Sequence, residues 1–168
     1  AEALDSFASG YTGKPNRPIR FGLIPTVAPY LLPDIFPSLQ RKLPDLRFTI
    51  SESRTEPLLA ALQDGSLDLA LIATEPTATG ARLCEEILFD DRFVLATERG
   101  EKVEGAVTLS MVPPERILLL DEGHCFRDQA IAACGLDSNR GAGTFAATSL
   151  STIVEFVANG QGVTLLPS

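Results

Sequence analysis

The stretch FTISESRTEPLLAALQDGSLDLALI, residues 48–72, decides the fold of this chain. It contains, in order, a short strand pattern, a serine- and threonine-containing helix start, an apolar helix, a glycine that ends the helix, and an apolar run of the length of a buried strand. Residues 145–166 repeat the same order of patterns. Two such βαβ units, one in each half of the chain, predict an α/β protein with two lobes of related build.

The segments before residue 48 extend the first lobe. A short apolar strand pattern at residues 19–24 leads through Thr26 into a helical pattern at residues 27–43. Pro33 and Pro37 fall inside this pattern and do not suit a helix interior, because proline removes a backbone donor and clashes with the preceding turn. The sequence therefore predicts a strand and then a helix that its own prolines weaken.

The boundary between the lobes is expected near Asp90-Asp91, which interrupts an extended pattern at residues 83–97. The beginning of the chain is rich in Gly, Pro, Asn and Lys and is typical of a linker. We therefore expect a linker at residues 1–18, lobe I at residues 19–90 and lobe II at residues 91–168.

Charge and composition limit the function classes. The formal net charge is −8, and an acidic domain lacks the basic face that direct nucleic-acid binding requires. There is no basic secretory signal at the start and no apolar run of membrane-spanning length. We expect a cytoplasmic protein without a membrane partner, in which three cysteines are not a disulfide framework.

The sequence GHCFRDQAIAAC, residues 123–134, carries the chemistry. Cys125 lies at the start of a predicted short helix, where unpaired N–H groups and the helix dipole favour a thiolate. Arg127 adds a positive charge within one turn, and His124 and Asp128 lie nearby. A thiolate in such surroundings is the form that peroxide oxidises to sulfenic acid, with which a second thiol can condense.

Cys134 follows nine positions later. On one continuous helix the two Cα atoms would lie about 13 Å apart, at ~1.5 Å per residue, whereas a disulfide requires about 7 Å or less. Bond formation would therefore require the helix to unwind, and the tail containing Gly135, Gly141 and Gly143 could absorb the change.

Each of these residues also has a structural interpretation. A free cysteine is more often a buried small hydrophobe, which is the interpretation favoured for Cys84 and, taken alone, for Cys134. One histidine and no C-x-x-C pair give no metal site, and we expect no cofactor. A Cys-His hydrolase fits poorly because adjacent side chains point apart. Thr26 and Thr55 are first of all candidate helix caps, although both fall at strand-to-helix junctions where ligands of α/β folds bind.

Several stretches together resemble one family. Residues 123–129 with Cys134 are similar to the redox switch of the peroxide-sensing LysR-type transcription regulators. The stretches 22–26, 29–33, 147–150 and 162–167, and the turn that contains Thr55, are similar to the regulatory domain of LysR-type regulators in general. The resemblance covers residues 17–168.

The resemblance implies a fold, a mechanism and partners. The fold would be two Rossmann-like lobes of the periplasmic-binding-protein type, with further strands and a helix after Ser168. Cys125 would be the peroxidatic cysteine and Cys134 the resolving cysteine. Thr26 and Thr55 would bind hydrogen peroxide, and the pocket would be supported by His124, Arg127 and Asp128.

The same resemblance implies a homodimer or homotetramer that rearranges on oxidation and is reset by a thiol reductant. DNA would be bound only through a preceding winged helix-turn-helix domain, and the protein would not be an enzyme. Two rivals remain: a LysR-type effector domain that binds a small organic anion, which gives Cys125 no role, and a thiol peroxidase.

Overall fold

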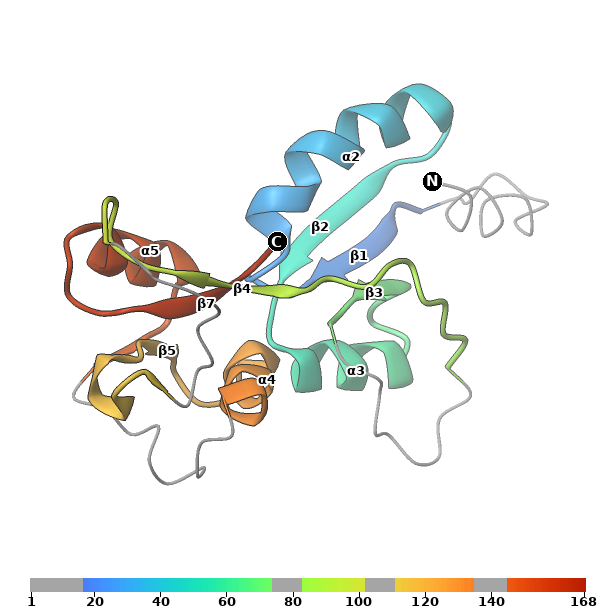
Figure 1. Ribbon diagram of the computed structural model, residues 1–168. Coiled ribbons are helices and arrows are strands. Elements are labelled where there is room, and N and C mark those ends of the chain that lie inside the picture. The colour runs from blue at the N-terminus through green and yellow to red at the C-terminus, as the bar shows by residue number, and fades with distance from the viewer. Residues whose placement is uncertain (1–16, 74–82, 102–110, 135–144) are drawn as a thin grey trace. The chain divides into compact units, whose positions relative to one another are not determined.

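The computed structural model describes residues 17–73, 83–101, 111–134 and 145–168 (Figure 1). The chain divides into two compact units, Ala1–Asp90 and Asp91–Ser168. Most of the linker expected at residues 1–18 lies outside the described residues, and the functional names given to the linker and the lobes stay predictions.

Unit 1 is built on a parallel three-stranded sheet with the order β2-β1-β3. Helix α2 (Ala28–Lys42) joins β1 (Ile19–Leu23) to β2 (Phe48–Glu52), and helix α3 (Thr55–Gln63) joins β2 to β3 (Leu69–Leu71). The two helices lie on opposite faces of the sheet (Figure 1). The central strand β1 is almost wholly buried because both faces are covered, which agrees with its apolar sequence.

Helix α2 forms in spite of its internal prolines. Pro29, Pro33 and Pro37 are spaced by four residues, so they share one side of the helix, and all three are exposed. The hydrogen bonds that Pro33 and Pro37 cannot donate are therefore lost on the solvent side, where water can satisfy the freed carbonyl groups. The apolar face still packs on the sheet through Ala28 and Leu32.

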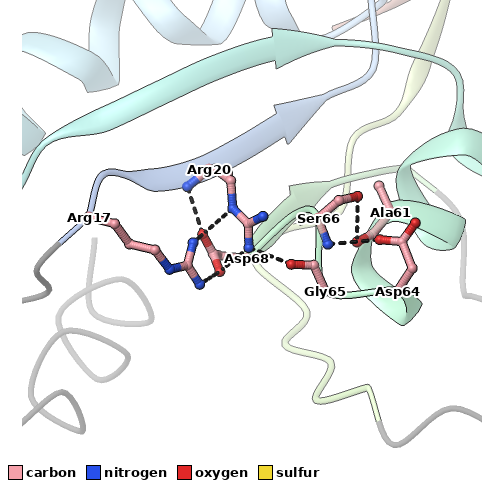
Figure 2. A network of polar contacts seen from close by, with 7 residues as sticks. All are labelled: Arg17, Arg20, Ala61, Asp64, Gly65, Ser66 and Asp68. Carbon is pink, nitrogen blue, oxygen red and sulfur yellow. Dashed lines mark hydrogen bonds and ion pairs between the residues drawn. The ribbon is translucent and has the colours of Figure 1, made fainter.

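A polar network holds the start of β1 against the loop between α3 and β3 (Figure 2). The Asp68 carboxylate accepts hydrogen bonds from both guanidinium groups: from Arg17 at 2.9 and 2.7 Å, and from Arg20 at 3.0 and 2.9 Å. It also accepts the Arg20 backbone N–H at 2.9 Å. Arg20 donates further to the carbonyl of Gly65 at 2.6 Å. These donors hold the pKa of the Asp68 carboxyl far below its usual value, with the Arg20 side-chain hydrogen bonds as the largest cause.

Unit 2 repeats this arrangement. Strand β5 (Leu119–Leu120) pairs in parallel with β6 (Ala146–Ala147), and a parallel bridge joins Ile117 to Val163, just before β7 (Thr164–Pro167). Helix α4 (Cys125–Cys134) follows β5, and helix α5 (Leu150–Ala158) joins β6 to β7. Strand β4 (Phe93–Ala96) pairs antiparallel with β7, and a 3-10 turn, η2 (Pro114–Arg116), precedes β5.

The two units share one strand order. In unit 1, β2 and β3 lie on either side of the earlier strand β1. In unit 2, β6 pairs with the earlier strand β5, and Val163, just before β7, pairs with Ile117, just before β5. The prediction of an α/β fold with two related lobes is confirmed. The extended region predicted at residues 83–97 is wrong in its extent, because only Phe93–Ala96 finds a strand partner among the described residues.

The core of unit 2 has two layers. Leu118 and Leu120 belong to one cluster of buried residues, and Ile117 and Leu119 belong to another. Because side chains alternate along a strand, the two clusters lie on opposite faces. The first includes α5 through Leu150, Ile153 and Val157. The second includes α4 through Ala130.

Candidate functional site

A tight turn delivers the cysteine helix from the end of β5. Gly123 has a φ of 85°, a left-handed conformation that favours glycine. The turn is fixed by two hydrogen bonds of 2.8 Å, from the Asp121 N–H to the carbonyl of Ala147 and from the Glu122 N–H to Asp121 Oδ1. As a result, His124 and Cys125 lie at the carboxyl edge of the parallel strands, at the start of α4.

The side chains at the start of α4 differ in their exposure. His124, Phe126 and Arg127 are 6%, 4% and 7% exposed. Cys125 is half-buried and carries a free thiol, while Asp128 is exposed. A half-buried thiol between buried neighbours is held in place and still accessible to a small oxidant, which is what a reactive cysteine requires.

Arg127 connects this turn to the sheet. Its Nη1 donates a hydrogen bond of 3.2 Å to the carbonyl of Leu120, the last residue of β5, and its backbone N–H donates to the carbonyl of His124 at 2.9 Å. The guanidinium group is therefore buried in the first turn of α4. The sequence predicted a positive charge in this turn, and its role in supporting a peroxide site stays a prediction.

Cys125 and Cys134 are the first and last residues of one continuous helix. At ~1.5 Å per residue the nine-residue step separates their Cα atoms by about 13 Å, which is beyond the reach of a disulfide. The two cysteines cannot bond while α4 is intact. The glycine tail expected to absorb the change, at residues 135–143, lies outside the described residues.

Thr26 and Thr55 lie at one edge of the sheet in unit 1. Each follows a strand by three residues, and the strand ends Leu23 and Glu52 are paired in register. Thr26 is 5% exposed. The Thr55 hydroxyl is buried, and among the described residues it has no hydrogen-bond partner.

The expectation that these threonines cap helices is wrong. The N-cap residues of α2 and α3 are Val27 and Arg54, and neither makes a side-chain capping hydrogen bond. Thr55 is instead the first residue of α3. A buried hydroxyl with no partner costs stability, and such groups gather where a ligand or water completes the bonding.

The candidate residues thus form two groups. His124, Cys125, Arg127 and Asp128 lie together at the start of α4 in unit 2, and Thr26 and Thr55 lie together at one sheet edge in unit 1. That the two groups meet around one ligand stays a prediction. Sequence patterns did not predict that Phe126 is buried in the core or that the Thr55 hydroxyl lacks a hydrogen-bond partner among the described residues. The spacing of residues determines neither the cluster in which an aromatic ring packs nor the hydrogen bonds of a hydroxyl.

Cys84 differs from the expectation of a buried hydrophobe, because its side chain is exposed. It lies in residues 83–92, where the structure has no strand or helix. Within the described part of the chain, no group of three or more His, Cys, Asp or Glu side chains is placed to hold a metal ion. In the same residues no helix is long and apolar enough to cross a membrane.

Comparison with known proteins decides the family. The LysR substrate binding domain matches residues 12–168. The chain belongs to this family. Over 99% of its length it is 43% identical to a probable hydrogen peroxide-inducible genes activator of Mycobacterium leprae and 37% identical to the DNA-binding transcriptional dual regulator OxyR of Escherichia coli, covering 55% of each.

A solved structure shows the same fold. The C206S mutant of Corynebacterium glutamicum OxyR, in its H₂O₂-bound form, aligns with a TM-score of 0.81 at 34% identity, over 99% of this chain and 54% of that one. The chain therefore spans about half the length of the relatives that it matches. The periplasmic-binding-protein-like architecture of LysR regulatory domains, expected from the sequence, is confirmed.

Proposed function

We propose that this chain is the peroxide-sensing regulatory part of a LysR-type transcription regulator, which converts hydrogen peroxide into a Cys125–Cys134 disulfide. One observation carries the proposal: two cysteines lie at opposite ends of one short helix, and the first is half-buried beside a buried arginine. The relatives named as peroxide-inducible gene activators support it over the full length of the chain.

The chemistry balances in two steps. The Cys125 thiolate attacks one oxygen of hydrogen peroxide, the O–O bond breaks, and sulfenic acid and hydroxide form. The Cys134 thiol then attacks the sulfenic sulfur, the S–S bond forms, and the sulfenic oxygen leaves as water. The two thiols lose two electrons, and one peroxide becomes two waters after the released proton is taken up. A thiol reductant resets the sensor by disulfide exchange.

Thr26 and Thr55 bind the peroxide beside Cys125 in this proposal, and His124, Arg127 and Asp128 support the pocket. The unpartnered hydroxyl of Thr55 supports the assignment, since a hydroxyl can donate to and accept from a peroxide. The location of Thr26 at the same sheet edge supports it as well.

Signal transmission follows from helix geometry. Disulfide formation removes α4 as a continuous helix, and this change alters a homodimer or homotetramer. DNA is bound through a separate domain of the longer regulator. The chain acts as a sensor that reacts once per signal, and it needs no cofactor and no continuous turnover of peroxide.

The test is one equivalent of hydrogen peroxide followed by non-reducing mass mapping. The expected product is a Cys125–Cys134 disulfide, and Cys84→Ser is the matched control that should form it equally well, since Cys84 is exposed. Cys125 left reduced, or paired with Cys84, would contradict the sensor and favour an effector domain that binds a small organic anion. Continuous consumption of excess peroxide in the presence of a reductant would favour a thiol peroxidase.

Cys134→Ser separates the two steps. Cys125 in this variant should still react with peroxide but stop at sulfenic acid, because no resolving thiol is present, and a dimedone adduct followed by mass spectrometry measures this. A variant that reaches the same oxidised structure as the unaltered chain would contradict the role of Cys134.

A further inference from the structure

Gly22 lies where helix α3 comes into close contact with the central strand of unit 1. A Cβ atom placed on Gly22 would overlap Leu58 Cδ2 and would lie only 2.8 Å from Leu67 Cδ2. Both leucines are buried, at 2% and 8% exposed, so neither side chain can turn away into solvent. The φ angle of Gly22 is not positive. The position therefore requires glycine for lack of space and not for its backbone conformation.

The contact is on the face of the sheet that α3 covers. Phe21 and Leu23, the neighbours of Gly22 on β1, pack in the cluster that includes Ala28 of α2. Because side chains alternate along a strand, a side chain on residue 22 would point to the opposite face, toward α3. Leu58 of α3 therefore packs directly on the backbone of β1, and the absence of a methyl group at residue 22 sets how deeply the helix packs.

Leu58 shares its side of α3 with Thr55. The two residues are three positions apart, which places them on one side of a helix. The Leu58 N–H donates a hydrogen bond of 3.2 Å to the carbonyl of Arg54, and the Ser53 N–H donates to the carbonyl of Leu23 at 3.0 Å, which holds the entry to this turn at the end of β1. The depth at which Leu58 packs therefore also sets the position of the Thr55 hydroxyl, which is buried and has no hydrogen-bond partner among the described residues.

We propose that Gly22 is a positioning residue for the peroxide reaction: it lets α3 pack directly on β1 and so holds the Thr55 hydroxyl at the depth at which it binds hydrogen peroxide. This inference rests on the proposed function, because it assumes that Thr55 binds peroxide beside Cys125. Gly22 acts through Thr55 and does not touch peroxide itself. Misplacement of a binding group by about 1 Å can slow a reaction by about a hundredfold, so the packing of one glycine is enough to change the rate.

Gly22→Ala is the direct test. The added methyl group pushes Leu58 and the first turn of α3 away from the sheet, so peroxide oxidation of Cys125 to sulfenic acid should slow by about tenfold. In a chain that already carries Thr55→Val, Gly22→Ala should slow this oxidation no further, because the hydroxyl that it displaces is absent. Dimedone trapping followed by mass spectrometry, in the Cys134→Ser background, measures the rates.

Two controls separate the position of Thr55 from the stability of unit 1. Gly65→Ala strains a glycine with a φ of 75° in the same unit, but its methyl group would meet no other atom within 4 Å. This variant should lower stability and leave the rate of peroxide oxidation unchanged. Alkylation of Cys125 by iodoacetamide needs no threonine hydroxyl and should be equally fast in Gly22→Ala and in the unaltered chain. Slower alkylation in Gly22→Ala would place its effect on the thiol itself and contradict the inference.

A reciprocal substitution tests the same contact from the helix side and does not depend on the folding of Gly22→Ala. Leu58→Val shortens the side chain over Gly22 and loosens the first turn of α3, so peroxide oxidation should slow a few-fold. The double variant Gly22→Ala/Leu58→Val adds a methyl group on the strand and removes one on the helix, which roughly conserves volume. It should react faster than either single variant.

Normal peroxide oxidation in a folded Gly22→Ala chain would overturn the inference. Equal slowing in Gly65→Ala, equal slowing by Gly22→Ala with and without Thr55→Val, or a double variant no faster than Leu58→Val would also overturn it. A Thr55→Val chain that oxidises at the normal rate would instead contradict the proposed role of Thr55, and absence of a Cys125–Cys134 disulfide would contradict the sensor itself.

Discussion

Thr55 and Thr164 both carry buried hydroxyls, but only one of them is used by the fold. Thr164 donates a hydrogen bond of 2.8 Å to the carbonyl of Leu118 and is 1% exposed. The Thr55 hydroxyl has no partner among the described residues. A paired buried hydroxyl contributes to stability, whereas an unpaired one costs stability and marks a place where a ligand or a water molecule can complete the bonding.

Valine substitutions at these two positions should therefore have opposite effects. Thr55→Val removes an unpaired buried group, so the free energy of unfolding should stay the same or rise by up to about 1 kcal/mol, while peroxide oxidation of Cys125 should slow by about tenfold. Thr164→Val, the matched control, should lose about 1 kcal/mol and react with peroxide at the normal rate. Urea unfolding measures the free energy of unfolding, and quenched-flow kinetics measure the rate of peroxide oxidation. A Thr55→Val chain that is less stable and equally reactive would show that this hydroxyl is structural.

Asp68 is the residue at which pH should act on unit 1. Arg20 and Arg17 lower the pKa of its carboxyl in the folded chain, so its contribution to stability is fully present above the unfolded pKa of about 3.9. The contribution is lost as the pH falls below that value, because protonation then favours the unfolded chain.

Asp68→Asn should consequently destabilise the chain by about 1–2 kcal/mol at pH 7. The expected loss is small for two ion pairs because solvent screens the interaction with Arg17, which is 57% exposed. The difference from the unaltered chain should shrink below about pH 4. Asp34→Asn, which removes an exposed carboxylate of α2, should change stability by less than about 0.5 kcal/mol. Denaturant unfolding at several pH values tests this, and a difference that does not shrink at all between about pH 5 and about pH 2 would exclude the ion pairs as its cause.

At the scale of elements, sequence patterns predicted the order of strands and helices but not their packing. Helix α4 was predicted as a short helix that starts near Cys125, and both cysteines lie on it as expected. The layer that Phe126 enters was not predictable, because it depends on where β5 ends relative to α5. The extended pattern expected at residues 83–97 forms a strand only at Phe93–Ala96 among the described residues, because pairing requires a partner strand that local sequence does not specify.

Helix α2 offers a test of how prolines are tolerated. Pro33 and Pro37 lie inside the helix and are exposed, so Pro33→Ala restores a hydrogen bond to the carbonyl of residue 29 without loss of packing. We expect a gain of about 1–3 kcal/mol in the free energy of unfolding. Pro29→Ala is the matched control with little effect, because Pro29 lies in the first turn, where no intrahelical donor is lost. An equal gain in stability from Pro33→Ala and Pro29→Ala would show that the missing backbone donor is not the reason why proline destabilises this helix.

At the scale of the whole molecule, one topology occurs twice. The sequences β1–α2–β2–α3–β3 and β5–α4–β6–α5–β7 each place the start of a helix at the carboxyl edge of a central strand. Thr26 follows β1 and Cys125 follows β5, so the two candidate groups hold equivalent places in their units. Repetition of one strand order therefore explains why the candidate residues recur at the same type of junction.

The charge of the whole chain predicts that it does not bind DNA by itself. With a net charge of −8, it repels phosphates at long range and has few cations with which to release counterions. Duplex DNA should therefore bind more weakly than about 100 µM, the weak end of ordinary non-specific affinity, in both the reduced and the peroxide-treated chain. Fluorescence anisotropy at about 150 mM salt measures this affinity, with a DNA-binding LysR-type regulator of full length as the positive control. Micromolar binding that weakens steeply with salt would place a DNA contact within this chain and contradict the assignment of DNA binding to a separate domain.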